Sequence, residues 1–225
     1  MNRFACALAA ALSVALPAAA SDADFLAAKA AFERNDEKAL VALQPKLAGH
    51  VLAPYAEYWR LKLGLDVADE ADVRAFLGRN AGSPLADLLR TDWLKMLGLR
   101  GLWTQFAQDY VPLPSDDVEL ACFAIQARRE REGDAALAAA KPLWLTGRAT
   151  PDACAPLFAA LFASGQLTAT DRYARLRLAS EAGNVRLVQA LALDGPPGDR
   201  IPEKDLRRVE ANPLGALAGG EFAWR

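Results

Sequence analysis

The sequence has few of the residues that build most metal and cofactor sites. It contains one histidine and three cysteines among 225 residues, too few to indicate a zinc or haem site with several protein ligands. It also has no glycine loop that could cradle a phosphate, no metal-ligand spacing and no nucleophile elbow. We therefore expect no metal and no cofactor.

An excess of charge of one sign and long apolar runs are also lacking. The 26 basic and 28 acidic residues give a net charge of -2, so nothing attracts the chain to phosphates and we expect no nucleic-acid partner. No apolar run reaches the about 20 residues that a membrane-spanning helix needs, so we expect no membrane span. A composition with 53% hydrophobic and 24% charged residues is typical of a soluble globular protein with one large or two small domains.

The first 20 residues have the pattern of a Sec-type signal peptide. Arg3 supplies a positive charge, residues 4–16 form an apolar stretch, and the alanines at 18–20 offer a cleavage site before Ser21. Cys6 lies too early in the apolar stretch to become a lipidated first residue. We expect removal of the segment and export of residues 21–225; the alternative is a buried N-terminal helix.

The rest of the chain has helical periodicity almost throughout. Hydrophobic residues recur at helical spacing, alternating β-branched runs are nearly absent, and Leu and Ala dominate. The pattern predicts helices over 22–34, 36–47, 54–64, 69–80, 84–98, 101–109, 116–131, 134–146, 151–164, 168–182, 184–193 and 202–210.

Capping residues support several of these boundaries. Ser83 and Thr150 each precede a proline, as an N-cap residue does when the proline opens the helix. Asp116 and Asp117 lie where carboxylates satisfy the free amides of a first turn. Glycines at or just after expected helix ends are predicted to be left-handed C-caps: Gly49, Gly98, Gly147, Gly165 and Gly183.

Short helices joined mostly by turns of a few residues predict an array of αα-hairpins. Each pair in such an array buries its apolar face against the next. No clean 34-residue repeat is present, so we expect an all-α fold in the form of an irregular αα-superhelix. Phe222 and Trp224 are large apolar residues where a finished array would have a polar cap. This indicates an array truncated at its C-terminus; the alternative is a tail that folds back.

Two cysteines remain after residues 1–20. In an oxidising compartment, Cys122 and Cys154 are predicted to form a disulfide, and a loop over 122–154 gives roughly 3–4 kcal/mol of stabilisation in the chain-entropy treatment. The two residues lie on helices two apart, which are neighbours in a solenoid. The alternative is a pair of separate buried thiols.

One segment resembles a known family. Residues 143–165 read LWLTGRATPDACAPLFAALFASG, which is similar to the α-superhelical N-terminal part of the soluble lytic murein transglycosylases. The resemblance continues through RLRLA at 175–179 and AGN at 182–184, and it includes the Leu-x-Pro-Tyr-x-Glu-Tyr pattern at 52–58. Cys122 lies where that family has the disulfide partner of Cys154.

The resemblance implies a periplasmic location, a U- or ring-shaped helical segment and peptidoglycan glycan strands as partner. In the family, a lysozyme-like domain carries one glutamic acid that acts first as general acid and then as general base. It cleaves the MurNAc–GlcNAc β-1,4 bond, and the muramic acid C6 hydroxyl closes a 1,6-anhydro ring. No Glu in this chain is followed by Ser, as the family's catalytic Glu is, so we expect no catalytic residue here and no catalytic domain.

A few side chains could form a binding or catalytic site, but their sequence context favours structural roles. A carboxylate beside aromatic residues is typical of a sugar-binding site, and Glu57 lies beside Tyr55, Tyr58 and Trp59. Helical spacing instead favours a packed aromatic face, with Glu57 bound to an amide or an arginine. His50 is interpreted as a capping or surface residue. Trp144 and Phe158 are interpreted as core residues. The charged run 128–132 is interpreted as a solvated helix end.

The sequence is compatible with two functions. The first is an architectural, glycan-engaging superhelical part of a lytic transglycosylase. The second is an autonomous periplasmic helical-repeat scaffold that binds a protein partner. Sequence alone does not identify the residues that contact glycan, nor the oligomeric state.

Overall fold

The computed structural model describes residues 21–112, 117–194, 198 and 200–218. The expected signal peptide, Asp116, Phe222 and Trp224 lie outside these residues. Every regular element in the described part of the chain is helical and none is a strand, which confirms the all-α prediction. The described residues divide into two compact units, one within residues 1–89 and one within residues 90–225.

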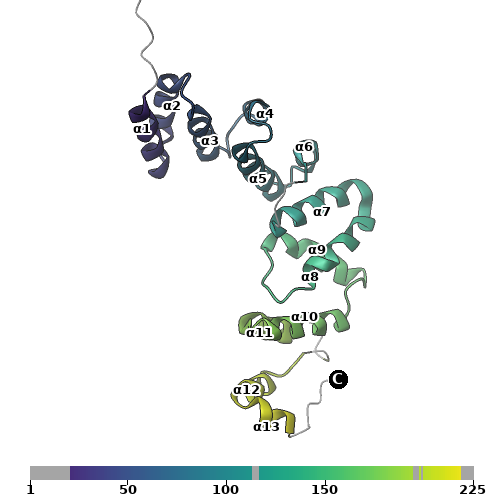
Figure 1. Cartoon of the computed structure of the whole chain (residues 1–225). Coiled ribbons are helices and arrows are strands. Elements are labelled where there is room, and N and C mark those ends of the chain that lie inside the picture. The colour runs from purple at the N-terminus through teal and green to yellow at the C-terminus, as the bar shows by residue number, and fades with distance from the viewer. Residues whose placement is uncertain (1–20, 113–116, 195–197, 199, 219–225) are drawn as a thin grey trace, which may run out of the picture. The chain divides into compact units, whose positions relative to one another are not determined.

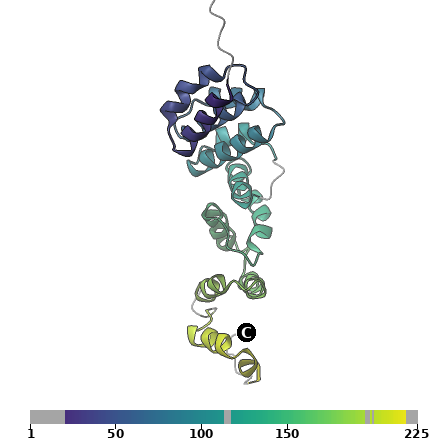
Figure 2. The same cartoon turned by 60° about the vertical axis from the view of Figure 1, so that its left-hand side comes forward.

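The first unit is built from short helices whose first turns are capped by side chains. Its elements are α1 (Asp22–Glu33), α2 (Glu37–Leu43), η1 (Gln44–Leu47), α3 (Ala53–Leu63), α4 (Glu70–Arg79) and the start of α5 (Pro84–Leu99). Asp36 and Asp69 accept hydrogen bonds from the first-turn amides of α2 and α4, and Ser83 does so for α5 as predicted. Helices α1, α2 and α3 pack against one another (Figures 1 and 2), around buried side chains such as Leu40 and Leu61.

The second unit continues the series of helices. Its further elements are α6 (Trp103–Asp109), α7 (Val118–Glu132), η2 (Gly133–Ala140), α8 (Lys141–Trp144), η3 (Asp152–Cys154), α9 (Ala155–Ala163), α10 (Ala169–Glu181), α11 (Val185–Leu193), α12 (Glu203–Ala211) and α13 (Pro213–Ala218). Helix α7 packs against α6, η2 and η3, while α10 and α11 form a hairpin (Figure 1). Asp117 caps α7 by accepting from the Leu120 amide at 2.9 Å, as predicted. The sequence pattern does not predict helix α13.

Three predicted helices are wrong as continuous elements, and each contains an internal proline. A proline lacks the amide hydrogen, and its ring collides with the carbonyl four residues earlier in a helix. Pro45 accordingly lies in the 3-10 turn η1 after α2, Pro142 lies at the start of α8 after η2, and Pro156 lies at the start of α9 after η3. The helices predicted over 36–47, 134–146 and 151–164 are therefore each split in two.

Two of the predicted C-cap glycines serve close packing instead. Gly49, Gly165 and Gly183 have φ angles of 83°, 72° and 67°, as left-handed caps require. Gly98, however, lies inside α5, where an added Cβ would come 2.4 Å from Cγ of Phe123. At Gly147 the Cβ would come 2.3 Å from the Leu178 carbonyl oxygen. Both positions exclude a side chain because another element touches the backbone there.

None of the described helices is long and apolar enough to cross a membrane. Within the same residues, no group of three or more His, Cys, Asp or Glu side chains could hold a metal ion.

Candidate functional site

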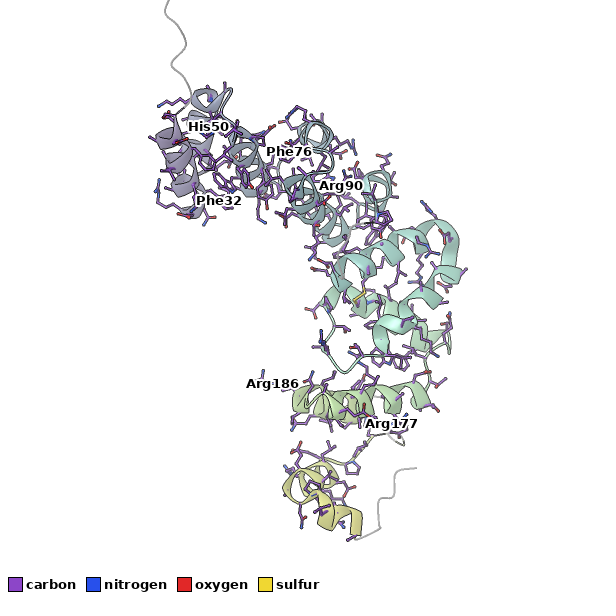
Figure 3. The ribbon with its side chains drawn as sticks, in the orientation of Figure 1. Phe32, His50, Phe76, Arg90, Arg177 and Arg186 are labelled. Atoms are coloured by element: carbon purple, nitrogen blue, oxygen red, sulfur yellow. A yellow bond between two sulfur atoms is a disulfide. The ribbon has the colours of Figure 1, made fainter. Side chains whose placement is uncertain are left out.

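A disulfide joins two elements of the second unit. Cys122 on α7 and Cys154 on η3 are bonded, with a Cα–Cα distance of 5.1 Å (Figure 3), so the structure contains the disulfide that the sequence predicts. Both residues are fully buried. They lie in a core cluster with Ile125, Leu137, Leu157 and Leu161, and the bond fixes η3 against α7.

Trp144 and Phe158 lie in the same core, as predicted, and a cation lies there with them. Their rings meet edge to face at 5.1 Å between centroids. The Arg175 guanidinium of α10 lies 3.9 Å from the centroid of the Trp144 ring, and the residue is only 3% exposed. Burial lowers the pKa of Arg175 from its usual value. Because a desolvated cation over an indole ring is stabilised by about 2 kcal/mol, Arg175 contributes to the packing of α10 on α8.

The loop between α8 and η3 is held by polar side chains from α10 and α11. Arg175 donates to the Arg148 carbonyl and to the Thr150 hydroxyl, both at 3.4 Å. Asn184 donates to the Gly147 carbonyl at 3.3 Å. The prediction that Thr150 caps the next helix is wrong, because Pro151 takes the N-cap position and the Thr150 side chain faces Arg175 instead.

A cavity of about 620 Å³ lies between α9 and α10, and we refer to it as the α9–α10 cavity. Its apolar lining consists of three aromatic residues and four smaller ones: Trp144, Phe158, Phe162, Ala155, Ala159, Leu167 and Ala169. Its polar lining residues are Thr168, Arg172 and Asp194. This volume is within the range of about 300–1,000 Å³ that is usual for small-molecule sites.

The polar end of the α9–α10 cavity is built around a buried arginine. Arg172 is 4% exposed, and its guanidinium donates to the carbonyl oxygen of Asp194, the residue after α11. Thr168 caps α10 in a reciprocal capping box with Asp171. A hydrogen bond from Lys141, helped by the Thr168 amide, lowers the pKa of Asp171.

Glu57 is bound to an arginine, as the sequence predicts. It lies on α3 and forms an ion pair with Arg79 at the end of α4. Its side chain is 28% exposed. Both residues line a second, open hollow of about 650 Å³ in the first unit.

The aromatic residues around Glu57 form a packed face only in part. Tyr58 and Trp59 are buried, and Trp59 stacks on Phe25 and Phe32, each at 5.4 Å between centroids. Tyr55 contacts both Phe25 and Trp59 but remains 43% exposed. The expected packed face therefore lacks Tyr55, because that side chain lies at the edge of the cluster.

His50 is a capping residue, as predicted, but its side chain is not on the surface. Its Nδ1 accepts from the Leu52 amide at the start of α3, which leaves the hydrogen on Nε2 to face Asp22 at 3.1 Å. The ring stacks on Phe25 at 5.6 Å, and the side chain is 7% exposed. Phe25 is far away in sequence, which is why the pattern around His50 does not predict its burial.

The charged run at the end of α7 is solvated, as predicted. Arg128 and Arg131 pair with Glu132, and Arg129 pairs with Asp134. The hydrogen bond from Arg128 lowers the pKa of Glu132. These local ion pairs leave no concentrated positive charge that could bind an anion.

Arg172 and Arg175 are the polar residues that sequence reasoning did not assign to the core. Arginines at positions i and i+3 of a helix are ordinarily exposed. The only signal in the sequence is that Arg175 belongs to the RLRLA segment of the family resemblance.

Comparisons with known proteins agree with that resemblance. No model of a known protein family matches the sequence. The chain is 31% identical over 165 residues to the soluble lytic murein transglycosylase of Salmonella typhimurium, and 30% identical over 165 residues to that of Escherichia coli. These alignments cover 73% of this chain and 25% of each relative, so the chain spans about a quarter of the length of the relatives that it matches.

Solved structures of such enzymes have the same fold. The 70 kDa soluble lytic transglycosylase of Escherichia coli matches with a TM-score of 0.72 and 27% identity over 87% of this chain. An inactive mutant of the lytic transglycosylase Slt from Pseudomonas aeruginosa matches with a TM-score of 0.75 and 30% identity over 91% of it. These matches cover 32% and 33% of the solved chains. The chain is therefore a homologue of the soluble lytic murein transglycosylases over most of its own length.

Proposed function

We propose that this chain forms the N-terminal superhelical part of a periplasmic soluble lytic murein transglycosylase. Its role is architectural: a helical wall that engages the glycan strand while the cleavage of the MurNAc–GlcNAc bond takes place on another part of the enzyme. The observation that carries this proposal is the homology over 165 residues, together with TM-scores of 0.72–0.75 to solved transglycosylases.

The local chemistry supports a role without catalysis. The residues of the family resemblance take part in a disulfide, in a cation–π contact and in a hydrogen bond to the loop between α8 and η3. All three interactions hold helices together. In the described residues, Glu57 is the carboxylate that the sequence singles out, and it pairs with Arg79 instead of lying in an apolar pocket. A general acid in this chemistry needs a raised carboxyl pKa from such a pocket.

Peptidoglycan sacculi provide the test. We expect the purified chain to release no 1,6-anhydro-muropeptides detectable by mass spectrometry, and to sediment with the sacculi in a pull-down. Release of anhydro products would contradict the absence of catalysis, and recovery only in the supernatant would contradict glycan engagement. An active transglycosylase assayed beside it is the control for both readouts.

A protein partner is the second candidate. A groove of about 290 Å³ between α10, α11 and α12 is lined mainly by apolar side chains, among them Leu176, Val188, Ile201 and Leu206. Val185, which also lines the groove, is 51% exposed. Absence of the chain from the sacculus pellet would favour this function over the first.

A further inference from the structure

Small residues and large aromatic residues alternate along the part of α9 that lines the α9–α10 cavity. Trp144 meets Phe158 at 5.1 Å and Phe162 at 5.2 Å between ring centroids, both edge to face. The other lining positions on α9 are Ala155 and Ala159, and both are exposed. The cavity therefore has an apolar wall that includes three aromatic side chains, and it is open to solvent.

The polar end of the cavity carries charges of both signs. Arg172, which is 4% exposed, presents a planar guanidinium with several donors. Asp194, which is exposed, contributes a carboxylate that can only accept. A phosphate or carboxylate ligand would be repelled by Asp194, and a cationic ligand would be repelled by Arg172. The pair of charges favours a neutral ligand with hydroxyl groups, which can accept from one side chain and donate to the other.

An apolar wall beside a donor and an acceptor matches the two kinds of surface on a pyranose ring. The C–H groups of a sugar face can pack on aromatic side chains, while its hydroxyl groups take the polar end. A lipid chain would leave Arg172 and Asp194 without ligand contacts, so it fits the cavity less well. The volume of about 620 Å³ is sufficient for a small saccharide.

We propose that the α9–α10 cavity is a saccharide-binding subsite that takes a neutral N-acetylhexosamine unit of the glycan strand. This inference rests on the proposed function, because it names the part of the wall that touches the glycan. Phe162 and Phe158 contact the apolar face of the sugar, and Arg172 and Asp194 bind its hydroxyl groups.

The test is a binding titration by calorimetry with a tetramer of N-acetylglucosamine, which has sugar rings and no peptide. The double variant Ala155→Leu/Ala159→Leu fills the cavity from two exposed positions, so we expect its binding to weaken about tenfold or more. The matched control is Ala135→Leu/Ala138→Leu on η2, two exposed alanines outside the cavity lining, which should bind within about twofold of the unchanged chain. Thermal unfolding checks that both variants fold.

Asp194→Asn gives a second measurement that does not depend on filling the cavity. The amide oxygen of Asn still accepts but is uncharged, and because hydrogen bonds to a carboxylate are stronger, binding of the neutral tetramer should weaken about threefold or more. The subsite is overturned if the unchanged chain sediments with sacculi but does not bind the tetramer, or if the filled variant binds it as well as the control does. Failure to sediment with sacculi would instead contradict the proposed function itself.

Discussion

Reduction of the Cys122–Cys154 disulfide should destabilise the second unit by a predictable amount. The bond joins residues separated by 32 positions in sequence. The chain-entropy treatment then gives about 4 kcal/mol of stabilisation at room temperature. For a chain of this size, 1 kcal/mol shifts the melting temperature by about 2–4 °C, so the expected decrease is about 8–16 °C.

The comparison is best made between the oxidised and the reduced form of the same chain. Reduction changes the cross-link while it leaves both sulfur atoms in the core, whereas Cys122→Ala/Cys154→Ala also removes buried volume and should cost more. Both cysteines are 0% exposed, so a reductant should act slowly on the folded chain and quickly in denaturant. Alkylation followed by mass spectrometry reports which form is present.

Melting curves recorded by circular dichroism and by calorimetry provide the readout. A melting temperature that is the same for both forms, within about 2 °C, would refute the entropic argument. So would rapid reduction of the folded chain in the absence of denaturant, because it would mean that the sulfurs are accessible.

Three further predictions concern single residues. Gly98→Ala should destabilise the folded chain by about 1–3 kcal/mol in a urea titration, because the added Cβ would meet Phe123. Gly78→Ala, in another helix where the added Cβ meets nothing, should stabilise the chain by about 0.5–1 kcal/mol. Equal effects of the two substitutions would contradict the close approach at Gly98. Arg175→Lys should cost about 1–2 kcal/mol, because the ammonium loses the planar contact with Trp144 and the hydrogen bonds that Nη2 of Arg175 donates to the Arg148 carbonyl and the Thr150 hydroxyl. An unchanged urea midpoint would argue against this. The folded pKa of Asp171 is lowered by Lys141, so the stabilisation from this carboxylate is present above the unfolded pKa of about 3.9 and disappears as the pH falls through the folded pKa. Asp171→Asn should therefore unfold more easily than the unchanged chain at neutral pH and equally easily in strong acid. A difference in stability that stays constant at all pH values would contradict this.

The helices could be predicted from the sequence because their signals are local. Periodicity of apolar residues locates α1, α10 and α11 to within one or two residues, and Ser83 and Asp117 cap the helices that they were expected to cap. The errors are also local: Pro45, Pro142 and Pro156 each interrupt a pattern that is otherwise continuous. A proline inside a periodic run therefore indicates a helix boundary.

The cavity could not be predicted in the same way, because it depends on contacts between distant residues. Arg172 donates to the carbonyl of Asp194, which lies 22 positions later in sequence, and Arg175 contacts Trp144 and the loop that follows it. The spacing of apolar residues in and around α10 does not indicate either contact. The cysteines could be paired because two of them remain after residue 20, on helices expected to be neighbours, and because the family resemblance implies the same pair.

The segment that resembles the transglycosylases has its specific residues at points of packing. Cys154 forms the cross-link to α7, Gly147 lies against the Leu178 carbonyl, and Trp144 lies under Arg175. Asn184 caps α11 through the Leu187 amide and also holds the Gly147 carbonyl. Each of these roles requires one residue type for a geometric reason: a second sulfur, no Cβ, a large aromatic face, or an amide that both donates and accepts. A catalytic motif would instead gather acids, bases or nucleophiles around one point. The residues with which the chain resembles its family are thus those that a rigid helical wall needs, which supports the architectural role proposed for it.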